Sequence, residues 1–162
     1  MRIMPFVLLA FAACGPSNAE LRTAKTAVYA DGSEVFAIAE QAAGDENYKL
    51  VADEGHLTFE TVPKWYSPEG DLQSAGADNY TTVDNHSVKV SFIVAVTSSG
   101  PGQFVVTVTP HTWQYVAGSP QMRELDPNDP YLPTWVTGRA DTLSLSIYDR
   151  AKGLALKPAG ST

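Results

Sequence analysis

The 162-residue chain has few of the residues on which common metal sites and disulfide scaffolds depend. Cys14 is its single cysteine, so neither an intrachain disulfide nor a multi-cysteine metal site can form. Three histidines are present, and their spacing matches no metal-binding motif. These are His56, His86 and His111. The sequence therefore excludes a disulfide-stabilised scaffold and a zinc-finger type of domain.

Motifs for nucleotide binding and serine catalysis are also absent. The chain contains neither Gly-x-Ser-x-Gly nor Ser-x-x-Lys, which carry nucleophilic serines in two large enzyme classes.

The segment 126–129 (Asp-Pro-Asn-Asp) offers oxygen ligands for calcium. It lacks the alternating spacing and terminal Glu of a calcium loop, so we interpret it as an acidic turn. We expect a protein that is not an enzyme and that holds no metal and no cofactor.

Basic residues are scarce compared with acidic ones. The chain carries 18 Asp and Glu against 11 Lys and Arg, a formal net charge of −7, and no cluster of Lys and Arg is visible. Nucleic acids and anionic lipid surfaces both attract such clusters. The composition therefore argues against a nucleic-acid partner.

Long hydrophobic runs are absent as well. The longest apolar segment, residues 3–13, has only about half of the roughly twenty residues that a membrane-spanning helix needs. It follows a single positive charge at Arg2 and ends in small residues, which is the pattern of a secretory signal peptide. Residues 1–13 therefore predict export of the chain.

Two cleavage sites fit this leader. Small residues at positions 17–19 suit a general signal peptidase, and cleavage after Ala19 would release a soluble secreted or periplasmic protein. The other site is Phe11-Ala12-Ala13-Cys14, which resembles the lipobox of bacterial lipoproteins. Phe11 departs from that pattern, because Leu is usual at its position.

The resemblance implies that Cys14 is lipidated on its sulfur and becomes the new N-terminus. A solitary thiol beside the cleavage site of an exported chain is better explained as an acylation site than as an unused residue. One acyl chain holds a protein to a membrane only marginally, so the triacylated terminus of the family implies stable attachment. Gly15 follows the cysteine, where the family uses Asp to retain proteins at the inner membrane, and it implies the outer membrane.

Beyond the leader, the chain has the length of one domain. Small polar residues predict a tether over 14–22, the single domain covers 23–157, and residues 158–162 form a flexible tail. Abundant Val and Thr, with frequent Gly and Pro, favour a sheet with long loops.

Periodicity predicts an α+β fold. Apolar residues three or four positions apart predict helices around 35–42 and 136–154. Alternation predicts an N-terminal strand at 23–30 and two hairpins, and Pro110 requires a bulge or an edge position in the second. The hairpin strands are residues 48–52 with 57–62 and residues 88–97 with 104–115. Together they give an antiparallel sheet, two hairpins plus the N-terminal strand, with two helices packed on one face.

Residues 64–84 and 117–133 show no sustained pattern and predict loops, where binding residues often lie. Trp65 and Tyr66 open the first of them. With Trp113 and Tyr115 they would line an aromatic groove for a small ligand; the alternative is that they cap the core.

The sequence thus predicts an exported envelope lipoprotein, non-catalytic and attached to the outer membrane through lipid on Cys14, with an envelope protein as its partner or a structural role. The first alternative is a small-ligand binding module built on the four aromatic residues. The second is a soluble secreted protein cleaved after Ala19. A hydrolase would require His86 or His111 within hydrogen-bond distance of a carboxylate in a cleft.

Overall fold

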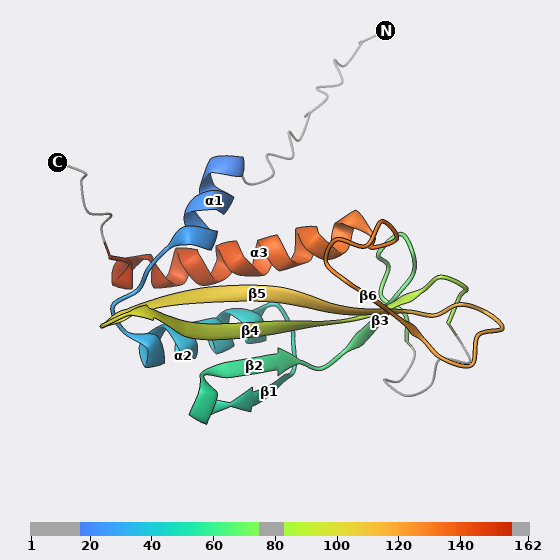
Figure 1. Cartoon of the computed structure of the whole chain (residues 1–162), viewed down its shortest axis with the longest axis horizontal. Helices are drawn as coiled ribbons and strands as arrows, with labels where there is room; N and C mark the ends of the chain where they lie inside the picture. Colours follow the sequence, from blue (N-terminus) through green and yellow to red (C-terminus); the bar gives the residue numbers. More distant parts are fainter. Residues whose placement is uncertain (1–16, 75–82, 157–162) are drawn as a thin grey trace, which may run out of the picture.

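A computed structural model describes residues 17–74 and 83–156. The predicted signal peptide, Cys14 and the tail at 158–162 lie outside these described residues. The fold is mixed α+β, with an antiparallel six-stranded sheet, two helices before it and one after it (Figure 1), which confirms the predicted class. In chain order the elements are α1 (Asn18–Thr26), α2 (Gly32–Asp45), β1 (Leu50–Asp53), β2 (Thr58–Thr61), β3 (Lys64–Tyr66), β4 (Val88–Gly100), β5 (Gln103–Gln114), β6 (Arg123–Leu125) and α3 (Thr134–Ala151).

The sheet is organised around the long β4–β5 hairpin. Its strand order is β1-β2-β4-β5-β6, and the short strand β3 pairs with β4 beyond the end of β2. The two predicted hairpins are therefore both present. A short 3-10 turn, Glu54–His56, connects β1 to β2.

The hydrophobic core lies between one face of this sheet and the helices α2 and α3. Alternate residues of β4 are all buried on that face: Val88, Val90, Phe92, Val94 and Val96. On the sheet, α2 packs mainly against β4 and α3 mainly against β5, and the two helices also pack closely against each other. Two helices on one face were predicted, and α2 and α3 form that layer. Helix α1 lies against α3.

Apolar spacing, a cap and a close contact explain helix α2. Val35, Ala39 and Ala42 are the buried side of α2, and Asp31 caps that helix by accepting a 2.9 Å hydrogen bond from the Glu34 amide. Gly32 begins α2 directly over the ring of Phe104. A Cβ at this position would lie 2.6 Å from Phe104 Cδ1, so the close approach of α2 to β5 requires a residue without a side chain.

The predicted strand at 23–30 is wrong, and so is the extent of the predicted tether. Residues 18–26 form α1, which begins at a capping box between Ser17 and Glu20. Only Tyr29 bridges to the sheet region, through backbone bonds with Phe104. Because the helix starts at residue 18, residues 18–22 of the predicted tether belong to α1.

The structure also decides the status of two predicted loops and of Pro110. β3 and β6 are three residues each and lie in segments predicted as loops. Pro110 stands opposite Phe92 within an unbroken register, and the irregularity of the hairpin lies instead at Ser98 and Gly100. β6, the described strand beyond β5, pairs only with residues 112–114. Pro110 thus occupies a sheet edge, the second of its two predicted positions.

Candidate binding site on the open face of the sheet

None of the described helices covers the face of the sheet opposite α2 and α3. In Figure 1, α2 passes behind β4, and β4 and β2 have no helix in front of them. We call this side the open face. Strand alternation and register assign to it the residues Val51, Asp53, Thr58, Glu60, Trp65, Lys89, Ser91, Ile93, Ala95, Thr97, Val105, Thr107, Thr109, His111, Trp113 and Glu124.

A polar cluster crosses this face and takes one residue from each of four strands. Its members are Glu60 on β2, Ser91 on β4, His111 on β5 and Glu124 on β6. His111 Nδ1 lies 3.2 Å from Glu60 Oε1, and His111 Nε2 lies 3.2 Å from Glu124 Oε1. The Ser91 hydroxyl donates to the same Glu60 oxygen at 2.5 Å. The imidazole is therefore held between two carboxylates.

The register of the sheet brings these residues together. Ser91 is directly opposite His111 across the β4–β5 pair, and Trp113 is directly opposite Glu124 across the β5–β6 pair. Ser91 is fully buried, and a buried hydroxyl without a partner would cost about 1–3 kcal/mol. Its bond to Glu60 meets that need and fixes the orientation of the carboxylate that faces His111.

Trp113 extends the cluster with an aromatic surface. The rings of His111 and Trp113 have centroids 3.8 Å apart at an angle of 46°. On the opposing strand, Lys89 Nζ lies 5.9 Å from the Trp113 centroid, within cation–π range. Lys89 is the cation that the register pairs with Trp113, so the aromatic end of the open face carries one positive charge.

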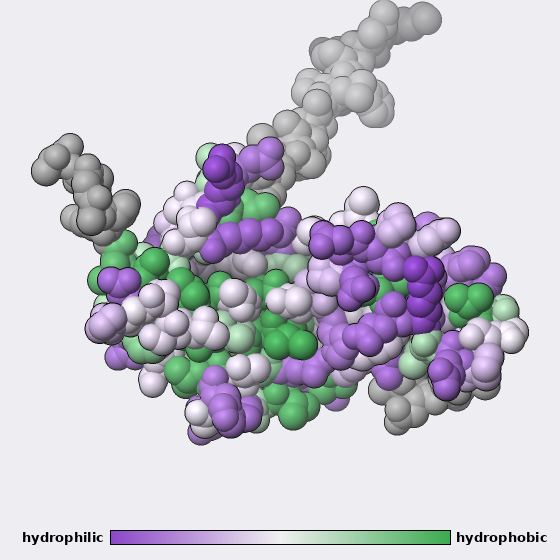
Figure 2. Space-filling view, viewed as in Figure 1, coloured by the Kyte–Doolittle hydropathy of each residue, from purple (hydrophilic) through white to green (hydrophobic). Residues whose placement is uncertain are grey.

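A groove of about 720 Å³ lies beside the cluster. It is lined by the polar Asp53, Glu60 and His111 together with apolar residues such as Val51 and Trp113. The side chain of Val51 is 67% exposed, a large fraction for an apolar residue. Figure 2, in the same view as Figure 1, shows apolar side chains gathered in the middle of this side of the molecule. The groove thus combines apolar walls with a few polar groups, as binding sites do.

The four aromatic residues predicted to form a groove are not on one surface. Trp65 and Tyr66 are neighbours on β3 and therefore point to opposite faces. The register places Trp65 on the open face, opposite Lys89, and Tyr66 on the core face, opposite Val88, and their exposed fractions are only 1% and 3%. The Tyr66 ring packs 5.1 Å from that of Trp135 on the helical side. Tyr115 lies just beyond β5, where its backbone bonds to Ser87 and His86. Trp113 is the one of the four that lines the groove.

The histidines occupy separate environments. His56 Nδ1 lies 2.8 Å from Asp53 Oδ2, and this hydrogen bond lowers the pKa of the Asp53 carboxyl. His86 has a positive φ of 66° in the turn before β4. Within the described residues no three His, Cys, Asp or Glu side chains gather as metal ligands. The carboxylates beside His111 face different nitrogens, so a metal ion on either nitrogen would meet only one of them.

His111 meets the distance that a hydrolase would require, since it lies within hydrogen-bond range of two carboxylates beside a groove. Both of its nitrogens are engaged, however, and the hydroxyl of Ser91 is buried and donated to Glu60. A nucleophile and its base need to face a substrate. The geometry therefore suits binding better than hydrolysis.

The acidic turn at 126–129 has its own partners. Asp129 Oδ2 accepts from Arg123 at 2.7 Å, and its Oδ1 accepts from the Tyr131 amide at 2.8 Å. The Asp129 amide in turn donates to the Asp126 carbonyl at 2.9 Å. These contacts are those of a closed turn, in agreement with the interpretation of the segment.

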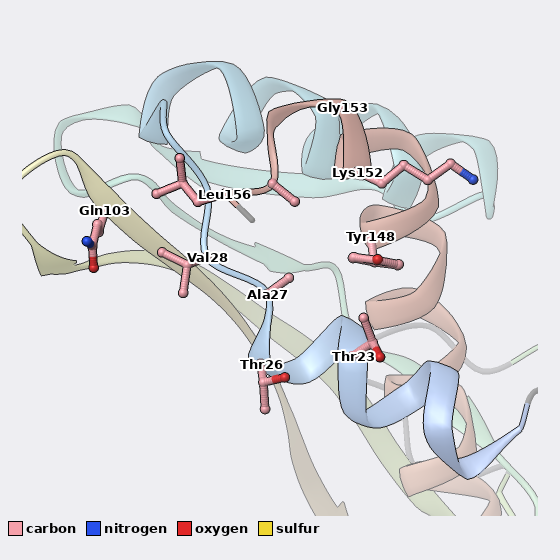
Figure 3. A pocket seen from close by; sticks show the side chains of 10 residues that line it. Thr23, Thr26, Ala27, Val28, Gln103, Tyr148, Lys152, Gly153 and Leu156 are labelled. Atoms are coloured by element: carbon pink, nitrogen blue, oxygen red, sulfur yellow. The ribbon is translucent and has the colours of Figure 1, made fainter. Parts of the chain in front are cut away.

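A second cleft, of about 900 Å³, lies between α1 and the end of α3. Figure 3 shows Thr23 of α1 and Tyr148 of α3 on facing sides of it. Its charged lining residue, Lys152, is 3.5 Å from Asp149. Small and apolar residues make up most of the remainder, including Ala27, Val28 and Leu156. The cleft offers no set of convergent polar groups among the described residues, so the open face is the better candidate site.

No helix among residues 17–74 and 83–156 combines the length and apolar character that crossing a bilayer requires. No protein-family model matches this sequence. A comparison with curated proteins also finds no match, so the candidate site stands on its geometry alone.

Proposed function

We propose that this protein is an exported bacterial lipoprotein, held at the outer membrane by lipid on Cys14, whose domain binds a partner and catalyses no reaction. The observation that carries the anchor is the position of the first helix. Its N-cap, Ser17, follows Cys14 by only three residues. Cleavage before Cys14 leaves this helix whole, whereas cleavage after Ala19 would cut into it.

The start of α1 is built by residues that the second cleavage would remove. The Glu20 amide donates to Ser17 Oγ at 3.3 Å, and the Ser17 amide donates to Glu20 Oε2 at 2.9 Å. This bond from the Ser17 backbone lowers the pKa of Glu20. Lys25 then pairs with Asp141 of α3 at 2.6 Å and ties the helix to the domain. A chain that began at Glu20 would lack Ser17, so the capping box could not form.

The capping box gives a prediction that can be checked directly. Replacing Ser17 with alanine should destabilise α1 by about 1 kcal/mol, because the Glu20 amide in the first turn loses its acceptor. Amide hydrogen exchange in residues 20–26 should become faster by several-fold. Asn18→Ala, one residue along the same exposed turn, is the matched control and should not accelerate exchange. Equal exchange in Ser17→Ala and the unchanged protein would contradict the role of the cap.

Metabolic labelling tests the anchor. Radiolabelled palmitate should be incorporated into the protein in a bacterial host and should be lost in Cys14→Ala, because Cys14 is the only thiol in the chain. The labelled protein should fractionate with the outer membrane. Absence of label, or label that survives in Cys14→Ala, would remove the anchor and leave the soluble secreted protein as the alternative.

The binding role is supported by the open face. Its groove combines apolar walls with a few ordered polar groups, as binding sites do. The groove beside Trp113 also supports the small-ligand alternative, now with one of the four predicted aromatic residues in place of all four.

A further inference from the structure

We propose that the open face binds a basic, extended segment of a partner protein, which lies diagonally across the strands from β1 to β6. This inference rests on the proposed binding role and is independent of the lipid anchor. It concerns three carboxylates, Asp53, Glu60 and Glu124, and the apolar surface between them.

The charge of the groove indicates a basic occupant. The side chains of Asp53, Glu60 and Glu124 are 61%, 40% and 65% exposed, so all three carboxylates are accessible. Among the described residues, no Lys or Arg lines the groove. The basic residues near these carboxylates include His56 beside Asp53, His111 between the two glutamates, and Lys89, whose ammonium faces Trp113. Lys49 is exposed just before β1, and its carbonyl accepts from the amide of Val62, which lines the groove. Ammonium or guanidinium groups of a partner would add charge-assisted hydrogen bonds here.

The same charge argues against a second copy of this chain. Two copies joined through their open faces would place these carboxylates against each other, and like charges across an interface are unfavourable. The chain as a whole has a net charge of −7, which adds to the repulsion. A basic partner is favoured at long range for the same reason.

The spread of the carboxylates indicates an extended occupant. Asp53 lies on the first strand of the order and Glu124 on the fifth, which at about 4.8 Å per strand is ~19 Å across the sheet. Through the register, Asp53 is level with Ala95 of β4 and Glu124 is level with Lys89, which adds ~20 Å along the strands. Glu60, level with Ile93, lies between them. A small molecule cannot reach all three, whereas an extended segment of about eight residues can.

The apolar surface fits the residues between the charges of such a segment. Val51, Val62 and Trp113 line the groove that runs beside Glu60 and His111. In an extended chain, every second side chain points to the same side. A segment that has both apolar and basic residues on the side facing the sheet can therefore contact the apolar surface and the carboxylates along one path. The partner we infer is therefore a segment of mixed Lys or Arg and apolar residues.

Fluorescence anisotropy with defined peptides tests this proposal. The probe is a labelled octapeptide, Lys-Lys-Val-Val repeated twice, which presents lysine and valine in turn on each of its sides when it is extended. It is titrated with the purified protein at low and at high salt. It should bind, and its affinity should fall as salt rises, because exposed charge pairs are screened. The matching octapeptide with glutamate in place of lysine should bind at least ten-fold more weakly. Failure of the lysine peptide to bind, or equal binding of both peptides, would overturn the proposal.

Variants locate the site. Asp53→Asn, Glu60→Gln and Glu124→Gln should each weaken binding roughly three-fold, and the triple variant about thirty-fold, as expected for exposed ion pairs of somewhat under 1 kcal/mol each. Asp149→Asn removes the same charge from an exposed position on α3 and should have no effect. An equal loss in Asp149→Asn and the triple variant would show non-specific attraction and overturn the assignment. Circular dichroism of each variant confirms that the fold is kept.

One further outcome separates the extended segment from a small cation. If lysine amide alone binds the protein as tightly as the octapeptide, the site takes a small cation at one carboxylate and the diagonal path is wrong. Loss of peptide binding with intact palmitate labelling would refute this inference alone. Intact peptide binding without labelling would refute the anchor alone.

Discussion

Replacing Phe92 with alanine should lower the free energy of unfolding by about 3–5 kcal/mol, a large part of the stability of an ordinary domain. Phe92 is in the middle of β4 and is almost fully buried in the layer between the sheet and the helices. Its ring meets Tyr48 edge-on, with centroids 5.5 Å apart, and its amide donates to Thr61 Oγ1 at 2.9 Å. Truncation would leave a cavity that these rigid neighbours cannot close.

Ile93, the next residue of the same strand, is the matched control. It points to the open face and is only partly buried. Ile93→Ala should therefore cost about 1 kcal/mol, since less apolar area returns to water. Urea denaturation followed by circular dichroism measures both variants. Similar losses at the two positions would mean that both faces of the sheet are covered, and the open face would have to be abandoned.

The contrast between these two neighbours also explains why the fold could be predicted. Val88, Val90, Phe92, Val94 and Val96 alternate without interruption, and a run of this length fixes which face of β4 is buried. The helices α2 and α3 carry an equally regular spacing of three and four residues. Long, strongly periodic segments specify their own structure because burial of one side dominates their energy.

The first helix was missed because two signals overlapped in the same residues. Ser17 and Glu20 form a capping box that is visible in the sequence, but small residues at 17–19 also fit a cleavage site. The stretch that follows, residues 23–30, contains Thr, Val and Tyr, which are common in strands, although its first four residues belong to the helix. The helix depends on packing against α3 and on the ion pair between Lys25 and Asp141, which only the tertiary structure supplies.

The candidate site was harder to predict than the fold. Alternation separates Glu60 and Ser91 from the apolar residues of their strands, but it does not say which strands are neighbours. The contact of Glu60 with His111 depends on β4 lying between β2 and β5, and on the register of both pairs. The prediction based on aromatic residues failed for a simpler reason. Trp65 and Tyr66 are adjacent, and adjacent residues in a strand cannot line the same groove.

Alkaline pH should destabilise the protein through Tyr29. Burial, with a smaller contribution from the charge of Tyr148, raises the pKa of Tyr29 to about 12 from its ordinary value of 10.0. The folded protein therefore holds the phenol proton at pH values where the unfolded chain has already lost it. The stabilisation is fully present below pH 10 and is lost as the pH rises to 12, because in that window the folded state binds more protons.

The size of this effect follows from the shift. Two pKa units at about 1.4 kcal/mol each give a full loss of about 3 kcal/mol above pH 12, of which about half has occurred by pH 11. Tyr29→Phe keeps the buried ring and removes the titrating hydroxyl, so between pH 8 and 11 its stability should decline by about 1.4 kcal/mol less than that of the unchanged protein. The stability of Tyr131→Phe, a control at an exposed position, should decline as that of the unchanged protein does.

Urea denaturation at pH 8, 10 and 11 provides the measurement. If Tyr29→Phe loses stability in parallel with the unchanged protein, the buried Tyr29 beside β5 does not control the alkaline transition. Burial also raises the pKa of Tyr48 and Tyr66, so those residues would then be responsible for it.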